Sequence, residues 1–185
     1  MSQSEITVKK KRASIGYNFL SLLTRTICAL RLNMMTQFER HVSINDLLSD
    51  RWETAKFLGF GEGTSCYNNA LVIGDVKVGE NTWIGPNVIL DGTGHLEIGN
   101  FVDISAGVQI YTHHTVNRCT SFGKDPIERM KTKIGNGVYI GPNSIIQMGV
   151  TIGDCAVVGA MSFVNSDIPA HAKVYGIPAK MKSSE

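Results

Sequence analysis

The sequence predicts a mainly β fold in which short strands coil into a triangular prism, preceded by an N-terminal helical segment. The first observation is a strict six-residue period of aliphatic residues after Leu71, which is the mark of an internal repeat. The second is that a glycine or another small residue follows many of these aliphatic positions. The third is helical spacing before Phe57, so the two patterns occupy separate parts of the chain.

Residues 13–57 have the apolar spacing of helices and no proline to interrupt it. Apolar residues recur at steps of three and four along the first stretch: Ile15, Phe19, Leu22, Leu23, Ile27 and Leu30. A second helix is predicted after Ser43, because Ser43 and Asp46 form an S-x-x-D start signal close to a capping box. Three glycines between residues 59 and 63 end it. This N-terminal helical segment covers residues 1–63.

The six-residue period is clearest between residues 134 and 164. One aliphatic residue falls on each repeat: Ile134, Ile140, Ile146, Ile152, Val158 and Val164. A second position of the repeat holds small or β-branched residues: Val138, Ser144, Val150, Ala156 and Ser162. The aliphatic position is also found upstream: Val78, Ile84, Ile98, Ile104 and Ile110. There the register shifts once, because the segment LDGTGHLE is two residues longer than the repeat.

A repeat of six residues suits a short strand of about four residues followed by a tight corner, and three such sides close a triangular coil. The aliphatic residue then points inward and stacks on its equivalent in the next coil, while glycine or asparagine supplies positive φ at the corners. Ile110 and Ile134 are in phase, so the segment between them is predicted to leave and return without disturbing the stack. The β domain covers residues 64–182, with an excursion loop at 112–133.

The composition excludes several classes of protein. The 185 residues are 43% hydrophobic and 18% charged with a formal charge of +2, which is typical of a globular domain rather than a disordered chain. Asn18, Arg25 and Arg31 interrupt the apolar stretch near the N-terminus and no small-residue cleavage site follows, so neither a signal peptide nor a membrane span is expected. The four cysteines form no CxxC pair. A reducing cytoplasm is therefore the expected location.

The repeats resemble those of the hexapeptide-repeat acyltransferases. The [LIV]-G-x-x-x-x pattern covers residues 60–182, and the resemblance implies a left-handed β-helix, an exception to right-handed crossovers. The segments ILDGTG, VQIYTHH and VVGAMSFVNSDIPAHAKVYGIPAK are similar to those of maltose, galactoside and cell-surface-polysaccharide O-acetyltransferases. This resemblance implies transfer of an acetyl group from acetyl-CoA to a sugar hydroxyl, as in the assembly of surface polysaccharides. It also implies a homotrimer with acyl-CoA bound between neighbouring subunits.

Two adjacent histidines follow the segment IYT, where the repeat stops. In the similar enzymes a histidine shortly after IYT is the catalytic base, which implies this role for His113, with His114 as the second choice. An imidazole with a pKa of about 6.5 suits removal of a hydroxyl proton near neutral pH. Adjacent side chains of a strand point to opposite faces, so one histidine is expected to be a bystander, or to satisfy hydrogen bonds at the loop entrance.

Asp91 lies about one coil below Tyr111 and therefore close to His113 across the coils. Its carboxylate is expected either to orient the imidazole, to bind a sugar hydroxyl, or to accept a hydrogen bond from its own turn, as aspartates commonly do. His95, in the long corner, is expected to be structural or exposed to solvent.

The C-terminal segment supplies the predicted acetyl-CoA contacts. By resemblance, the backbones of Pro142 and Ala160 line the pantetheine groove, Asn165 and Ser166 take the place of a usual Thr-Lys pair, and Lys180 reaches the nucleotide. The serine at position 166 departs from that pattern and removes one lysine contact. Positive charge suited to phosphates comes from three lysines: Lys173, Lys180 and Lys182. Alternatively, GIPAK forms a turn fixed by its proline, with a lysine exposed to solvent.

The loop and the N-terminus carry the remaining charged motifs. The excursion is long and polar, so it is expected to wall the acceptor pocket, where Arg118, Lys124 and Arg129 either contact an anionic sugar or remain solvated. The run KKKR at residues 9–12 precedes an amphipathic helix. This run is either a flexible, solvated arm or a weak contact with an anionic lipid surface.

Other functions fit parts of the pattern. An amino-sugar N-acetyltransferase or a serine acetyltransferase would use the same base and the same donor. A zinc-dependent carbonic anhydrase needs three converging histidines, whereas His41 and His171 lie outside the repeat core, so no metal is expected. A scaffold without turnover is the third alternative. No nucleic-acid partner is expected.

Overall fold

The computed structural model describes residues 3–181, with side chains from Gly16 onward. The chain forms two compact units, divided between Leu48 and Ser49. In the first unit, α1 (Gln3–Phe38) is one helix of 36 residues, and the short α2 (Ile44–Leu48) contacts it. Among the described helices, none is both long and apolar enough to cross a membrane.

The helical pattern after Ser43 is divided into two short helices. Ser43, which directly precedes α2, donates its hydroxyl to the carboxylate of Asp46 within that helix at 2.6 Å. The second helix, α3 (Arg51–Phe57), starts with a complete capping box at Asp50. The Asp50 carboxylate accepts from the Trp52 N–H at 2.7 Å, and Glu53 accepts from the Asp50 N–H at 3.3 Å. This second cap interrupts the helix because an N-cap residue leaves the helical conformation.

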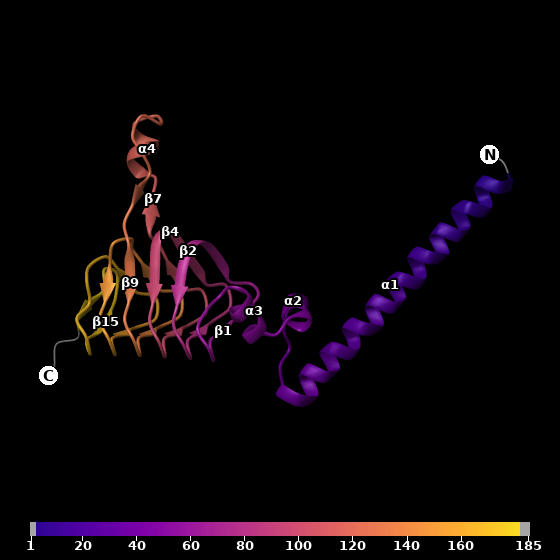
Figure 1. Ribbon diagram of the computed structural model, residues 1–185, viewed down its shortest axis with the longest axis horizontal. Coiled ribbons are helices and arrows are strands. Elements are labelled where there is room, and N and C mark those ends of the chain that lie inside the picture. The colour runs from indigo at the N-terminus through magenta and orange to yellow at the C-terminus, as the bar shows by residue number, and fades with distance from the viewer. Residues whose placement is uncertain (1–2, 182–185) are drawn as a thin grey trace. The chain divides into compact units, whose positions relative to one another are not determined.

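The second unit confirms the predicted fold class, a mainly β, left-handed parallel β-helix preceded by helical segments (Figure 1). Its coils are built from these strands: β1 (Ser65–Cys66), β2 (Leu71–Val78), β3 (Trp83–Ile84), β4 (Ile89–Ile98), β5 (Asp103–Ile104), β6 (Gln109–Ile110), β9 (Thr132–Ile134), β10 (Tyr139–Ile140), β11 (Ile145–Ile146), β12 (Thr151–Ile152), β13 (Val157–Val158), β14 (Phe163–Val164), β15 (Lys173–Tyr175) and β16 (Lys180–Met181).

The strands form the three faces of a prism. Face one contains β1, β3, β5, β10, β13 and β15, all parallel, and ends with the antiparallel β16. The long strands β2 and β4 bend and belong to two faces. Their first halves join β6, β11 and β14 in face two, and their second halves join β9 and β12 in face three. We call the corner between faces one and two edge 1–2, and the corner between faces two and three edge 2–3.

The core consists of stacked inward-facing aliphatic residues, as the six-residue period predicts. Ile140 pairs with Val158 on face one, and Ile146 pairs with Val164 on face two, all at most 1% exposed. The small position of the repeat is buried at a corner, where Ser144 donates to the Gly159 carbonyl at 2.9 Å and ties neighbouring coils together. Larger side chains would not fit there.

Asparagines occupy corners in the left-handed conformation. Asn87 and Asn143 both have φ of 57°, as predicted for glycine or asparagine at these turns. The prediction covers only part of the corners, because Phe101, Cys155 and Met161 also adopt positive φ.

The excursion leaves the prism at edge 2–3 between β6 and β9. It consists of β7 (His113–His114), α4 (Val116–Thr120) and β8 (Glu128–Arg129), and it projects away from the coils (Figure 1). The chain returns in register, because Ile110 stacks with Ile146 on face two while Ile134 stacks with Ile98 and Ile152 on face three. The insertion therefore leaves the core continuous and places both histidines at its base.

Candidate active site

His113 lies where the excursion joins edge 2–3. Its Nδ1 atom lies 2.5 Å from Oδ2 of Asp91, which comes from β4 in the preceding coil. The His113 side chain is 30% exposed, while that of Asp91 is only 1% exposed. The described residues provide a hydrogen-bond partner for Nδ1 of this imidazole but none for Nε2. One nitrogen is therefore held by the prism and the other is open to an incoming group.

Asp91 receives hydrogen bonds from three residues. Its Oδ1 accepts from the backbone N–H and hydroxyl of Thr93 at 3.0 and 2.5 Å, and Oδ2 accepts from the Thr112 N–H at 2.9 Å as well as from His113. Burial raises the pKa of this carboxyl, but the hydrogen bonds outweigh burial and lower its pKa to about 2. An ionised carboxylate next to Nδ1 favours the tautomer that keeps the proton on Nδ1 and a lone pair on Nε2.

These contacts combine two of the interpretations offered by the sequence. The bonds from Thr93 are those of an aspartate turn, and the bond to His113 orients an imidazole. Thr93 and Thr112 were not predicted as site residues. The D-x-T spacing of Asp91 and Thr93 could have predicted the bond between them. The bond from Thr112 could not be predicted in this way, because it depends on which coils are neighbours.

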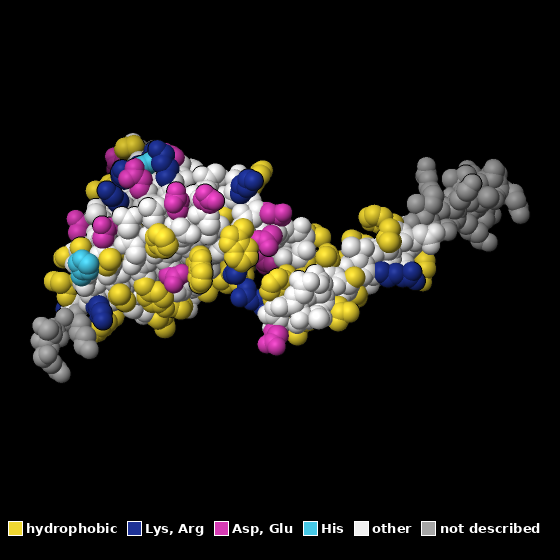
Figure 2. Space-filling view, turned by 60° about the horizontal axis from the view of Figure 1, so that its bottom comes forward, with side chains coloured by type: hydrophobic (Ala, Val, Ile, Leu, Met, Phe, Trp, Pro, Cys, Tyr) yellow, Lys and Arg dark blue, Asp and Glu magenta, His cyan; other side chains and the backbone are white. Residues whose placement is uncertain are grey.

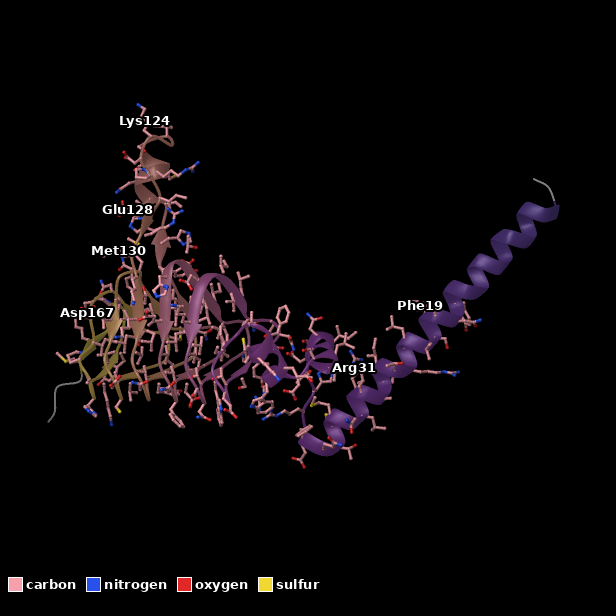
Figure 3. The ribbon with its side chains drawn as sticks, in the orientation of Figure 1. Phe19, Arg31, Lys124, Glu128, Met130 and Asp167 are labelled. Carbon is pink, nitrogen blue, oxygen red and sulfur yellow. The ribbon has the colours of Figure 1, made fainter. Side chains whose placement is uncertain are left out.

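His114 points away from Asp91 and contacts the excursion. Its Nε2 atom lies 3.4 Å from a carboxylate oxygen of Glu128 on β8, and its Nδ1 accepts from the Val116 N–H at 3.4 Å. Asn117 donates to the same Glu128 side chain, so the carboxylate ties α4 to the two-stranded β7–β8 ribbon. Figure 3 labels Glu128 along this projection and Lys124 near its tip. Both ring nitrogens of His114 have partners, unlike those of His113.

The base of the excursion is fastened to the prism by threonines. The buried Thr112 donates its hydroxyl to the Asp91 carbonyl at 2.8 Å and accepts from the Gly94 N–H at 2.7 Å. Its own carbonyl accepts from the Met130 N–H at 2.9 Å, where the chain returns. Thr132 donates to the Tyr111 carbonyl at 2.8 Å. These bonds hold the backbone beside His113 at both ends of the excursion.

A second histidine network lies on the same edge. His95 contacts Asp75 through Nδ1 at 2.6 Å and Glu97 through Nε2 at 2.9 Å, and Lys131 lies 2.7 Å from the same Glu97 oxygen. The bonds from Lys131 and His95 lower the pKa of Glu97 to about 2. Both nitrogens of His95 are engaged, so this imidazole connects β2 and β4 rather than offering a base.

We expect His95 to make stability depend on pH. Its hydrogen bonds to Glu97 and Asp75 raise the pKa of His95, so its charged form stabilises the fold fully below the unfolded value of about 6.5. That contribution is lost as the pH rises through the raised pKa. In urea unfolding, the advantage of the wild type over His95→Gln should therefore be larger at about pH 6 than at about pH 9.

His171→Gln is the matched control, because His171 also has positive φ, 63° against 77° for His95. Within the described part of the chain His171 has no ion pair. A wild-type advantage at His95 that stays constant with pH, or an equal pH effect at His171, would contradict the assignment.

The predicted acetyl-CoA residues lie on two edges and at one end of the prism. Pro142 and Ala160 are exposed at equivalent positions of edge 1–2, where the Met161 N–H donates to the Pro142 carbonyl at 2.8 Å. Asn165 and Ser166 follow β14 on edge 2–3. The structure therefore does not bring all of these residues together within one chain. Lys182 lies outside the described residues.

One pocket at the C-terminal end of the prism does join two of the predicted residues. Ser166 and Lys180 both line it, together with Asp167, Pro169 and Met181. The pocket therefore combines a lysine with a polar corner, although Asp167 adds an acidic group.

The outer surface of face two carries a row of mostly aliphatic residues, unlike that of face three. In register, the outward positions of face two are Leu71, Ile89, Gln109, Ile145 and Phe163. The corresponding positions of face three are Lys77, Glu97, Lys133 and Thr151. Leu71 is 52% exposed and the other residues of the face-two row are half-buried. An aliphatic strip thus separates the edge that carries His113 from the edge that carries Pro142 and Ala160.

Comparisons with known proteins identify the repeat. The family described as bacterial transferase hexapeptide (six repeats) matches residues 131–166, from β9 to the turn after β14. The chain carries a hexapeptide-repeat domain. In this domain, the matched repeats form the coils that follow the excursion in the chain, and they include Pro142, Ala160 and Asn165.

Relatives of the hexapeptide-repeat domain include named acetyltransferases. Galactoside O-acetyltransferase of Escherichia coli K12 is 35% identical over 115 residues, which is 61% of this chain and 47% of that enzyme. The chain thus spans about half the length of this relative. Solved structures include a maltose O-acetyltransferase of Clostridium difficile 630, with a TM-score of 0.59, 26% identity and 87% of each chain covered. A hexapeptide-repeat acetyltransferase of Vibrio cholerae O1 biovar eltor, solved with acetyl coenzyme A, has a TM-score of 0.64 and 25% identity, covering 86% of this chain and 88% of that one.

Proposed function

We propose that this protein transfers the acetyl group of acetyl-CoA to a hydroxyl group of a sugar, with His113 as the general base. The observation that carries the proposal is the pairing of the open His113 imidazole with the buried Asp91 carboxylate at the base of the excursion. The names of the relatives support the class of acceptor, because they include galactoside and maltose O-acetyltransferases, and the neighbour solved with acetyl coenzyme A supports the donor.

The proposed reaction needs one base if both substrates are held in place. Nε2 of His113 accepts the proton of the acceptor hydroxyl as that oxygen attacks the thioester carbonyl. The tetrahedral intermediate then collapses, the C–S bond breaks, and the imidazolium returns its proton to the CoA thiolate. Asp91 stays ionised, keeps the Nδ1 proton in position and stabilises the imidazolium. The products are the acetyl ester and CoA.

The proposed site is completed by a second copy of the chain. In one copy, His113 on edge 2–3 and the pair Pro142 and Ala160 on edge 1–2 lie on either side of face two. If face two turns toward a three-fold axis, edge 2–3 of each copy meets edge 1–2 of the next, and the aliphatic row is buried at the axis. The contact is of the head-to-tail type, and three copies close it into a ring. We therefore propose a homotrimer with its sites between subunits.

We expect Ile145→Glu to dissociate this trimer. Ile145 lies between Gln109 and Phe163 in the aliphatic row, and a carboxylate there would bring three like charges together near the axis. Light scattering should show monomers. Turnover should fall at least tenfold, because each proposed site needs two copies, and a tenfold loss corresponds to about 1.4 kcal/mol.

Val157→Glu is the control, because Val157 occupies the corresponding outward position of face one. A trimer that survives the change at Ile145, or one that dissociates only with the change at Val157, would place the contact on another face.

The excursion is proposed to wall the acceptor site. It rises beside His113 and carries Arg118, Lys124 and Arg129, which are exposed. Phe122 near its tip is 96% exposed and adds an apolar side chain of the kind that packs against a sugar ring. An acceptor that carries a phosphate or a carboxylate would meet the three cations of the excursion.

We place the reaction in the cytoplasm. The four cysteines, Cys28, Cys66, Cys119 and Cys155, are free, which suits a reducing compartment. Burial raises the pKa of the Cys66 thiol to about 11, so this thiol stays protonated inside the prism.

The test is an acceptor screen with acetyl-CoA, in which a thiol reagent measures released CoA. Sugars with a free hydroxyl and their amino counterparts should be compared as matched pairs, because an amine acceptor would use the same base and donor. Faster turnover of the amino sugars would favour an N-acetyltransferase. Absence of CoA release with every acceptor would favour a scaffold and contradict the proposal.

A further inference from the structure

The N-terminal helix α1 separates the charges of the chain. Residues 6–38 contain six Lys and Arg residues and no Asp or Glu: Lys9, Lys10, Lys11, Arg12, Arg25 and Arg31. The other 152 residues carry twelve cationic and sixteen acidic side chains, which gives them a formal charge of −4. Residues 6–38 of this helix therefore hold a charge of +6, which Glu5 in its first turn offsets by only one.

The same helix exposes large apolar side chains. From Gly16 onward these side chains are between 42% and 75% exposed: Tyr17, Phe19, Leu20, Leu22, Leu23, Leu32, Met35 and Phe38. Figure 2 shows hydrophobic and basic side chains along the described part of α1. Within its own unit, α2 is the element that contacts α1, and it has only five residues. So large an apolar surface on a long helix marks an interaction site.

We propose that α1 binds the surface of an anionic membrane and lies in the plane of the interface. Apolar side chains would enter the headgroup region, and the cations would pair with lipid phosphates. The backbone carries the run 9–12 within the same helix as the apolar residues, so both features belong to one continuous element. Arg25 and Arg31 are compatible with this position because long cationic side chains reach from an apolar boundary to the headgroups.

The charge pattern favours lipid over a second copy of α1. Helices that pair with one another usually carry acidic and basic residues that alternate beside the apolar seam. Two copies of α1 would instead bring six cations against six cations, without a carboxylate between residues 6 and 38. An anionic bilayer supplies the missing negative charge, and each Lys or Arg near its surface adds to binding.

The experiment is sedimentation of the full-length protein with lipid vesicles. Vesicles of phosphatidylcholine with about one third phosphatidylglycerol should bind the protein, and vesicles of phosphatidylcholine alone should not. Added salt should weaken binding, because it screens the attraction. The triple variant Lys9→Gln, Lys10→Gln, Lys11→Gln should bind anionic vesicles at least tenfold more weakly, because glutamine keeps the helical preference but removes the charge.

A matched control removes three cations from the second unit, in the variant Lys56→Gln, Lys77→Gln, Lys133→Gln. It has the same net charge as the first variant and should bind like the wild type. Equal losses in the two variants would mean that net charge, not α1, binds the lipid, and would overturn the proposal. So would a wild type that ignores anionic vesicles, or a loss of oligomer mass in a Phe19→Ser, Leu22→Ser variant, which would assign α1 to contacts between copies.

Discussion

Replacing His113 with glutamine is expected to lower kcat by about 10²- to 10⁴-fold, the usual contribution of a general base. Glutamine fills a similar volume and retains hydrogen-bonding groups, but it cannot accept and return a proton during turnover. The KM for acetyl-CoA should change little, because the proposed donor contacts are made by other residues, such as Pro142, Ala160 and Lys180, and not by the imidazole. Steady-state kinetics with the acceptor found in the screen, together with the melting temperature, separate lost chemistry from lost folding.

His114→Gln is the matched control for this prediction. It removes a neighbouring imidazole whose two nitrogens already contact Glu128 and the Val116 N–H. Its kcat should stay within about threefold of the wild type, which corresponds to less than 1 kcal/mol in the barrier. If the variant at His114 loses as much activity as the variant at His113, or if His113→Gln remains active, the base has been assigned to the wrong side chain.

The sequence predicted the prism well because its stabilising contacts repeat locally. Each inward residue stacks on an equivalent one coil away, so the six-residue period carries the core pairs, such as Ile146 with Val164. It also predicted that Ile110 and Ile134 would remain in their stacks despite the excursion. The proximity of Asp91 and His113 followed from the same register, once the two extra residues of the long corner were allowed for.

Other features of the structure depend on contacts that the six-residue repeat does not predict. The helix break at Asp50 arises from a side-chain cap that competes with a continuous apolar pattern. The partners of Asp91 and His114 depend on the path of the excursion, which has no repeat of its own. The residues matched to acetyl-CoA binding were assigned by resemblance, and spacing along one chain cannot show that Pro142 and Asn165 belong to different edges.

Asp91→Asn is expected to reduce kcat by about 10²- to 10⁴-fold without removing the base itself, because an uncharged amide neither fixes the Nδ1 proton as firmly nor stabilises the imidazolium. Asp91 acts as a positioning residue, so the test needs a second readout. In the folded wild type, the N–H groups of Thr93 and Thr112 donate to the Asp91 carboxylate. The asparagine amide would turn an N–H donor of its own toward them, and this mismatch should lower the free energy of unfolding by about 1–3 kcal/mol.

The pH dependence of stability supplies that second readout. Because the folded pKa of Asp91 is lowered to about 2 from its ordinary value of 3.8, its carboxylate stabilises the fold fully above about pH 4. This contribution is lost as the pH falls through about 2, so the advantage of the wild type over Asp91→Asn in urea should shrink on acidification. Asp103→Asn, at an exposed carboxylate on face one, should change neither kcat nor this slope. Full activity in Asp91→Asn would show that His113 needs no carboxylate behind it, and an unchanged slope would show that Asp91 is not held as a buried anion.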